Sequence, residues 1–357
     1  MKKILVVDDS ALVRRVLCDI INSDNRFQVE DKATNGLEAL ELLTKKSYDA
    51  VVLDINMPKM TGLELLKELQ KRKIAARVIM ASTDTKEGAK VTMDALDLGA
   101  MDFVHKPSSA MGCKREDFRD QLIEILGAVT ESKVLSSFSK PFSKEDAKPS
   151  KKMVDLLSRH EGKLGGKRIV AIASSTGGPK ALQSVIPKLS GRLNAPVVIV
   201  QHMPTGFTAS LAERLNALSE MNVKEACEGD ELQAGTVYIA KGGQHLNINC
   251  SGARHVIHYT DEPAREGVKP CANYMYESLA KSKYDVAVCV VLTGMGADGT
   301  KGISYLKEKK KIHVIAQNED TCAVYGMPKN IVKTGLVNQE IPLEQVAQEI
   351  MMNVGVI

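Results

Sequence analysis

Carboxylates follow two short apolar segments near the start of the chain. Asp8 and Asp9 come directly after residues 4–7, and Asp54 comes directly after residues 51–53. If both segments are strands of one parallel sheet, their carboxyl ends meet at the edge where such sheets bind ligands. Three carboxylates at one edge repel each other unless a hard divalent cation lies between them, and oxygen ligands of this kind suit Mg²⁺.

A serine and a lysine follow the next two apolar segments. Ser82 comes shortly after residues 78–80, and Lys106 comes after residues 103–105. The lysine can balance the charge of an added anion, and the serine hydroxyl can donate a hydrogen bond to it. A carboxylate nucleophile, Mg²⁺ and a lysine together can accept a phosphoryl group. Helix capping would explain one Asp after each strand, but not an adjacent pair or the lysine.

A different set of reactive side chains follows three β-branched segments in the second half of the chain. Each segment ends near one of them: Ser175 after residues 169–173, His202 after 197–200 and Asp298 after 286–292. A hydroxyl, a base that takes its proton and an acid that orients the base are the groups that acyl transfer needs. The surrounding glycines permit tight turns whose N–H groups can stabilise an oxyanion. Each residue alone has a simpler explanation, because Ser and Asp also cap helices and a His can end a strand.

Two motifs point to different functions, the first to a hydrolase and the second to a dinucleotide-binding module. Residues 173–177 match the nucleophile elbow G-x-S-x-G except for alanine at the first position, and the order Ser, His, Asp differs from that of α/β-hydrolases. Residues 294–299 read G-x-G-x-x-G, and Glu319 and Asp320 follow about 20 residues later, which is the pattern of a dinucleotide site. Because Asp298 inside that turn would repel a pyrophosphate, a hydrolase is favoured over a nucleotide-binding module without hydrolase activity.

Alternating strand and helix patterns place these residues in two α/β units with parallel sheets. The first unit is predicted to cover residues 1–129 and the second residues 167–357. Residues 130–166 are rich in Ser, Lys and Pro and lack hydrophobic periodicity, which predicts a linker. In the second unit, the apolar segments 236–240 and 246–248 flank Lys-Gly-Gly, which predicts a β-hairpin beside a mostly parallel sheet.

The composition excludes several classes of protein. The chain has 357 residues, 44% hydrophobic and 26% charged, which argues against disordered, collagen-like and coiled-coil chains. No apolar run approaches the ~18–20 residues that span a bilayer, and the N-terminal run is too short for a secretory signal. Seven scattered cysteines without a CxxC pair suit a reducing compartment, so we expect a cytoplasmic protein without membrane insertion. A net charge of +4 and the lack of tryptophan argue against nucleic-acid binding.

The first unit resembles the receiver domain of two-component response regulators. The resemblance rests on Val6-Val7-Asp8-Asp9-Ser10, Leu53-Asp54-Ile55-Asn56-Met57-Pro58, Ser82 and Lys106-Pro107. It implies a flavodoxin-like parallel sheet whose five strands lie in the order 2-1-3-4-5. It also implies that a partner histidine kinase phosphorylates this unit at Asp54.

The receiver resemblance further implies a Mg²⁺ site and a set of switch residues. The metal would be held by Asp9, Asp54 and the Asn56 carbonyl, with Asp8 acting through water. The residues that respond to phosphorylation would be Ser82, Phe103 and Lys106.

The second unit resembles the catalytic domain of the chemotaxis protein-glutamate methylesterase/glutamine deamidase (CheB) family. The matching segments are Ile-Ala-Ser-Ser-Thr-Gly-Gly at 172–178, Gln-His-Met-Pro at 201–204, Leu-Thr-Gly-Met-Gly-Ala-Asp-Gly at 292–299 and Gly-Met-Pro at 326–328. The resemblance implies hydrolysis of glutamyl methyl esters on the cytoplasmic helices of chemoreceptors, and deamidation of certain receptor glutamines. It also implies activation by phosphorylation, with a chemotaxis histidine kinase as the phosphodonor.

The same resemblance assigns roles to five residues and needs no cofactor for hydrolysis. Ser175 would be the nucleophile, His202 the general base and Asp298 the acid that orients it, while the Met295 N–H would donate to the oxyanion and Thr176 would assist. Residues 265–273 lack the Arg-Pro-Ser-Val-Asp pattern that the family leads us to expect there, so the substrate contacts of this segment are expected to differ.

Overall fold

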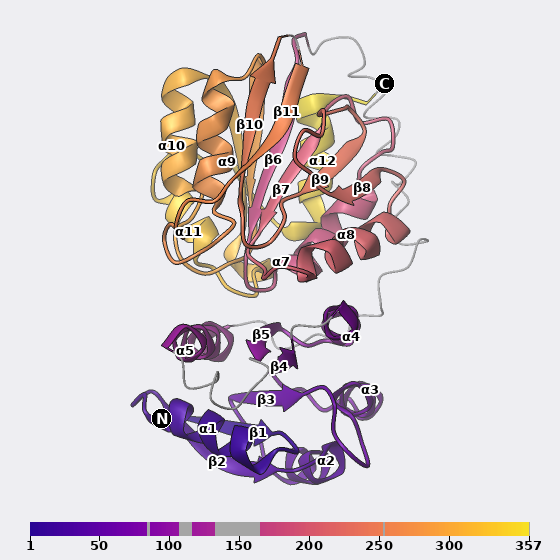
Figure 1. Ribbon diagram of the computed structural model, residues 1–357, viewed down its shortest axis with the longest axis vertical. Coiled ribbons are helices and arrows are strands. Elements are labelled where there is room, and N and C mark those ends of the chain that lie inside the picture. Colours follow the sequence, from indigo (N-terminus) through magenta and orange to yellow (C-terminus); the bar gives the residue numbers. More distant parts are fainter. Residues whose placement is uncertain (84–85, 107–115, 133–164, 253, 357) are drawn as a thin grey trace. The chain divides into compact units, whose positions relative to one another are not determined.

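The structure is a computed structural model that describes residues 1–83, 86–106, 116–132, 165–252 and 254–356. The chain divides into two compact units, Met1–Pro141 and Phe142–Ile357 (Figure 1). The last helix of the first unit ends at Glu131, and the first strand of the second begins at Arg168. The predicted linker, residues 130–166, lies mostly outside the described residues, so its boundaries stay a prediction.

A five-stranded sheet forms the centre of the first unit. Its strand order is β2-β1-β3-β4-β5 and every pair is parallel, which confirms the predicted 2-1-3-4-5 sheet. The central strands are apolar runs buried on both faces, as expected where helices cover both sides of a parallel sheet. The strands are β1 (Lys2–Val7), β2 (Phe27–Ala33), β3 (Ala50–Asp54), β4 (Val78–Thr83) and β5 (Asp102–Lys106).

Five helices cover this sheet, with α1 and α5 on one face and α2, α3 and α4 on the other (Figure 1). Side-chain caps fix where three of them begin. Ser10 and Asn35 accept hydrogen bonds from the first turns of α1 and α2, and Thr61 forms a capping box with Glu64 in α3. The helices are α1 (Ala11–Asn22), α2 (Gly36–Lys45), α3 (Gly62–Arg72), α4 (Lys86–Asp97) and α5 (Glu116–Glu131).

A seven-stranded parallel sheet forms the centre of the second unit, in the order β14-β13-β12-β6-β7-β9-β8. The most buried strands, β6, β7 and β12, lie side by side in its middle. The strands are β6 (Arg168–Ser174), β7 (Val197–Gln201), β8 (Asn222–Glu225), β9 (Thr236–Ile239), β12 (Val286–Val291), β13 (Lys311–Gln317) and β14 (Gln339–Ile341).

The predicted hairpin exists, but its position was wrong. The strand at 236–239 is β9, which pairs in parallel with β7 and β8. The hairpin is formed instead by β10 (His245–Ser251) and β11 (Arg254–Thr260), which pair antiparallel. Its inner residues, such as Leu246 and Ile257, join the core on one face of the large sheet.

Helices cover both faces of the large sheet (Figure 1). On the face of the hairpin lie α9 (Ala272–Ser278), α10 (Thr300–Lys309) and α11 (Met327–Val332). On the other lie α7 (Gly178–Val185), α8 (Phe207–Leu218) and α12 (Leu343–Val354). Short 3₁₀ turns occur at Ile186–Lys188, Leu279–Lys281 and Glu319–Thr321. No helix within the described residues is long and apolar enough to cross a membrane.

Candidate functional sites

The predicted acidic cluster forms at the carboxyl ends of β1 and β3. One carboxylate oxygen from each of Asp8, Asp9 and Asp54 lies within 4.8 Å of the others. Lys106, at the end of β5, places Nζ 2.7 Å from Asp8 Oδ2 and 2.8 Å from Asp54 Oδ1. Asp8 and Asp54 are buried, whereas Asp9 is exposed. The structure therefore brings together four of the predicted receiver residues.

The charges of this cluster are unbalanced without a further cation. Burial raises the pKa of the Asp54 carboxyl, and the Lys106 ammonium offsets this only in part. Burial also lowers the pKa of Lys106, but Asp54 and Asp8 outweigh it, so the net shift is upward. One ammonium therefore faces three carboxylates. This all-oxygen set fits Mg²⁺, and the backbone carbonyl of exposed Asn56 makes no hydrogen bond with any described residue.

The two other predicted switch residues lie on the neighbouring strands. Ser82 is fully buried in β4, and its Oγ lies 2.8 Å from Thr92 Oγ1 and donates to the Gly88 carbonyl of α4 at 3.4 Å. Phe103 is buried in β5, where it lies opposite Met80 of β4. In this structure the Ser82 hydroxyl therefore links β4 to α4.

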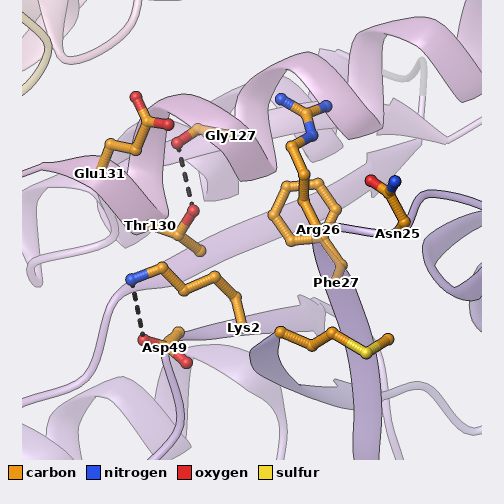
Figure 2. A pocket seen from close by; sticks show the side chains of 9 residues that line it. Lys2, Asn25, Arg26, Phe27, Asp49, Gly127, Thr130 and Glu131 are labelled. Atoms are coloured by element: carbon orange, nitrogen blue, oxygen red, sulfur yellow. Dashed lines mark hydrogen bonds and ion pairs between the residues drawn. The ribbon is translucent and has the colours of Figure 1, made fainter.

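The opposite edge of this sheet carries an open cavity, of about 550 Å³. Figure 2 shows Lys2, Arg26 and Phe27 at the amino ends of β1 and β2, together with Asp49 and the last turn of α5. Lys2 pairs with Asp49 at 3.5 Å, and the Arg26 guanidinium lies 5.0 Å from the centre of the Phe27 ring. The cavity thus lies at the amino ends of the strands, whereas the acidic cluster lies at their carboxyl ends.

In the second unit, the predicted catalytic residues follow three adjacent strands. Ser175 follows β6, His202 follows β7, and Asp298 lies in the loop between β12 and α10. His202 Nε2 lies 2.7 Å from Asp298 Oδ2, and the His202 side chain is 10% exposed. Ser175 is half-buried, and its N–H donates to the carbonyl of Thr293 at 3.0 Å. This packing joins the turn after β6 to the loop after β12.

Asp298 is surrounded by hydrogen-bond donors. Oδ1 accepts from the Asn273 and Gly299 N–H groups at 2.9 and 2.7 Å and from the Cys271 thiol at 3.0 Å, and Oδ2 accepts from the Ala272 N–H at 2.6 Å. Burial alone would raise its pKa, but His202 and these donors lower the pKa to about 2. The side chain is therefore an anion whose Oδ2 faces the imidazole. Asp298 thus places a negative charge at the N-terminus of α10, where the rival dinucleotide site would bind its pyrophosphate.

The analysis of the sequence missed two residues that support Asp298. Cys271 precedes α9, and burial together with the nearby Asp298 raises its pKa to about 12, so the thiol keeps its proton and can donate. His245 of β10 is fully buried; its Nδ1 accepts from the Cys271 N–H at 3.2 Å, and its Nε2 lies 3.2 Å from the Pro263 carbonyl. Both ring nitrogens are thus engaged, and His245 fixes the segment that carries the donors to Asp298.

The loop after β12 presents backbone N–H groups beside Ser175. The Gly294 carbonyl accepts from the Met327 N–H at 2.8 Å, which anchors this loop on α11. A Cβ at Gly294 would lie 2.7 Å from the Ser175 Cβ, so only glycine permits this close approach. Within the described part of the chain, the N–H groups of Met295 and Thr176 make no hydrogen bond. A donor to an oxyanion must be unpaired in this way, and the supporting roles of Met295 and Thr176 stay a prediction.

The depressed pKa of Asp298 predicts how stability depends on pH. The folded-state pKa, about 2, lies below its ordinary value of 3.8, so the contribution is present above about pH 4 and is lost as the pH falls through 2. The shift corresponds to about 2 kcal/mol. Between about pH 5 and about pH 2, wild type should lose more unfolding free energy than Asp298→Asn, by up to about this amount.

Urea unfolding followed by tyrosine fluorescence measures this difference, because every tyrosine except Tyr48 lies in the second unit. The control is Asp320→Asn, which removes an exposed carboxylate from the same unit. Equal losses for wild type and Asp298→Asn would contradict the prediction.

Two family models match the chain. The model described as CheB methylesterase matches residues 170–350, and the response regulator receiver domain matches residues 4–113. A curated protein from Syntrophomonas wolfei, named protein-glutamate methylesterase/protein-glutamine glutaminase 1, is 41% identical over 98% of this chain and 98% of its own. The chain belongs to the CheB methylesterase family.

Further relatives of this CheB-family chain agree with the division into two units. A protein-glutamate methylesterase/protein-glutamine glutaminase from Bacillus subtilis is 40% identical over 98% of both chains. The crystal structure of the Thermotoga maritima CheB methylesterase catalytic domain is 39% identical, covers 53% of this chain and 98% of its own, and has a TM-score of 0.50. The chain is therefore a response-regulator member of an enzyme family, and both family resemblances stated from the sequence are confirmed.

Proposed function

We propose that this CheB-family chain is a phosphorylation-activated protein-glutamate methylesterase. Its substrates would be glutamyl methyl esters on the cytoplasmic helices of chemoreceptors, and glutamine side chains at such sites would be deamidated by the same chemistry. The observation that carries the proposal is the His202–Asp298 pair, 2.7 Å apart, at the sheet edge where Ser175 directly follows the neighbouring strand β6. The names of the relatives supply the substrate class.

The orientation of His202 decides which nitrogen acts as the base. Because Nε2 faces Asp298, Nδ1 is the nitrogen that would take the proton of Ser175 Oγ. Asp298, held as an anion, stabilises the imidazolium that forms and keeps the proton on Nε2 in the resting state. The acid and base thus have fixed roles before substrate binds.

The reaction would proceed in two half-reactions. Ser175 Oγ attacks the ester carbonyl, and the oxyanion accepts hydrogen bonds from the Met295 and Thr176 N–H groups. His202 passes its proton to the leaving oxygen, so methanol departs and an acyl-serine remains. Water then attacks this ester with His202 again as base, which returns Ser175 and releases glutamate. With a glutamine substrate the leaving group is ammonia.

In the receiver, Asp54 would be the phosphoryl acceptor. Asp9, Asp54 and the Asn56 carbonyl would hold Mg²⁺, with Asp8 acting through water, and the bound ion would supply positive charge that offsets the charge of the phosphoryl group. Lys106 lies 2.8 Å from Asp54 and can follow a new anion as a point charge. A chemotaxis histidine kinase would be the phosphodonor, and the protein would act in the cytoplasm.

Phosphorylation would act through Ser82 and Phe103. A phosphoryl group at Asp54 offers the Ser82 hydroxyl an acceptor stronger than its present partners in α4, and Phe103, already buried in β5, would repack as that contact changes. We expect the receiver to restrain the hydrolase until this switch occurs. A tenfold activation needs a difference of only ~1.4 kcal/mol between the two states.

The test is direct hydrolysis of a methylated substrate. The full chain, treated with acetyl phosphate and Mg²⁺, should release methanol from the methylated cytoplasmic fragment of a chemoreceptor. Mass spectrometry should find that glutamyl peptides lose one methyl group per site and that some glutamines become glutamate. Unchanged peptides from receptors of the host organism, with active acetyl phosphate, would contradict the proposed substrate class.

A further inference from the structure

A buried glutamine joins the two strand ends that carry the proposed nucleophile and base. Gln201 is the last residue of β7, and its side chain is 1% exposed. Its Nε2 donates to the backbone carbonyl of Ser175 at 2.9 Å and to that of His202 at 3.1 Å. One amide nitrogen therefore bridges the main chain of both residues.

Ser174 fixes the orientation of this amide. Its buried Oγ donates to Gln201 Oε1 at 2.7 Å, so the oxygen end faces a hydroxyl and the nitrogen end faces two carbonyls. The reverse orientation would place Oε1 against two carbonyl oxygens, which only accept hydrogen bonds. Both N–H groups and the oxygen of Gln201 are thus paired in one arrangement.

The amide lies where the main-chain pairing of β6 and β7 ends. The His202 N–H donates to the Ser174 carbonyl at 3.0 Å, one step beyond the paired residues Ser174 and Gln201. After that the chains separate, toward α7 and α8. Among the described residues, no hydrogen bond joins these two loops beyond the one amide.

Gly178, the first residue of α7, leaves space for the amide. A Cβ at this position would overlap Gln201 Oε1 and would lie 2.9 Å from the Ser174 Cβ. Unlike Gly177, which has a φ of 74°, Gly178 does not adopt a left-handed conformation. The second glycine of the Ser-Thr-Gly-Gly turn is therefore required by packing against Gln201.

We infer that Gln201 is a positioning residue for the hydrolase: its amide sets the spacing between Ser175 and His202 across which the proton moves. This inference rests on the proposed function. Removal of the amide leaves the His202 carbonyl without its donor and leaves the Ser175 carbonyl only the Gly178 N–H, at 2.7 Å within its own turn. The hydrogen bonds that tie one loop to the other are then lost, and the two loops can shift relative to each other. A misplacement of ~1 Å costs on the order of 10²-fold in rate, because proton transfer requires close alignment.

The test is Gln201→Met, which keeps the length of the side chain and removes the amide. The kcat for methyl-ester hydrolysis should fall about 10- to 100-fold, with KM changed by less than about twofold. The rate at which a fluorophosphonate labels Ser175 should fall by the same factor, because labelling uses the same transfer of the serine proton. A general loss of folded protein would instead lower the labelled fraction and leave the rate constant of the remainder unchanged.

Two further variants complete the design. Gln183→Met makes the same change at a buried glutamine of α7 whose Nε2 has no hydrogen-bond partner among the residues that the structure describes, and it should leave kcat within about twofold of wild type. Ser174→Ala removes only the hydroxyl that orients the amide, and it should slow labelling by a smaller factor than Gln201→Met. Where Gln201→Met does not fold, Ser174→Ala decides the question.

The outcomes separate this inference from the proposed function. Wild-type protein that is not labelled at Ser175 would refute the proposed function, whatever Gln201 does. Wild type labelled at Ser175, with Gln201→Met and Ser174→Ala labelled at the wild-type rate, would overturn the role of Gln201 alone. Slower labelling of Gln201→Met with an unaffected Gln183→Met supports it.

Discussion

Replacing Ser175 by alanine should abolish ester hydrolysis, and replacing His202 by alanine should do nearly the same. Without Oγ no acyl-enzyme can form, and without the imidazole the serine keeps its proton at neutral pH. In serine hydrolases with such a triad, loss of either group costs roughly 10⁶-fold in kcat. Asp298→Asn should cost on the order of 10⁴-fold, because the imidazole loses the anion that orients it. Methanol release from a methylated receptor fragment measures all three.

The double variant Ser175→Ala/His202→Ala provides the internal control. Residues that act as one unit lose their effects non-additively, so the double variant should be little worse than either single variant. Urea unfolding followed by tyrosine fluorescence, which reports mainly on the second unit, should show that each variant's hydrolase unit is folded. Near-normal turnover by Ser175→Ala would refute the assignment of the nucleophile.

The grouping of residues at strand ends could be predicted from the sequence. Asp8, Asp54 and Lys106 lie far apart in the chain, yet a parallel sheet brings its carboxyl ends to one edge, and the structure places them within ion-pair distance. The same rule brought His202 and Asp298 together, since β7 and β12 both adjoin β6. These strands were easy to recognise because a strand that is buried on both faces appears in the sequence as a continuous run of β-branched apolar residues.

The partners of strands were harder to predict than the strands themselves. The segments at 236–239 and 245–251 are both strands, separated by a turn that contains two glycines, and this pattern is typical of a hairpin. However, β9 adds to the parallel sheet, with Val197 opposite Val237, whereas β10 pairs with β11. Periodicity reports which faces are buried, and it does not report which strand lies alongside.

The residues that support Asp298 were missed because their contacts are long-range. His245 contacts Cys271, and Cys271 contacts Asp298, across separations of 26 and 27 residues. The sequence predicts only that the substrate contacts of residues 265–273 differ from the family pattern, and it gave no sign that their last three residues all donate hydrogen bonds to Asp298. One signal in the sequence could have pointed to them. Cys271, His245 and Gln201 have polar side chains near predicted core strands or site residues, and a polar side chain that is buried needs a hydrogen-bond partner.

Replacing Asp54 by asparagine should prevent phosphorylation of the receiver while basal hydrolysis persists. The amide has nearly the shape of the carboxyl but is a poor nucleophile and a poor Mg²⁺ ligand, so phosphoryl transfer loses both functions at once. Lys106 would keep its 2.7 Å contact with Asp8, so the fold of this edge should survive. Incubation with acetyl phosphate and Mg²⁺, followed by mass spectrometry of the peptide that contains residue 54, measures the phosphoryl group.

Three comparisons make this result decisive for the proposed activation. Asp49→Asn, at the opposite edge of the receiver sheet, should be phosphorylated as wild type is, because it lies far from the strand ends that hold the acceptor. A fragment beginning at Lys167 should be more active than the unphosphorylated full chain and indifferent to acetyl phosphate, since it lacks the acceptor and the restraint. Acetyl phosphate should raise hydrolysis by wild type and leave Asp54→Asn at its basal rate. If Asp54→Asn is activated as strongly as wild type, the signal enters elsewhere, and the acidic cluster that Lys106 joins is not the site that controls Ser175.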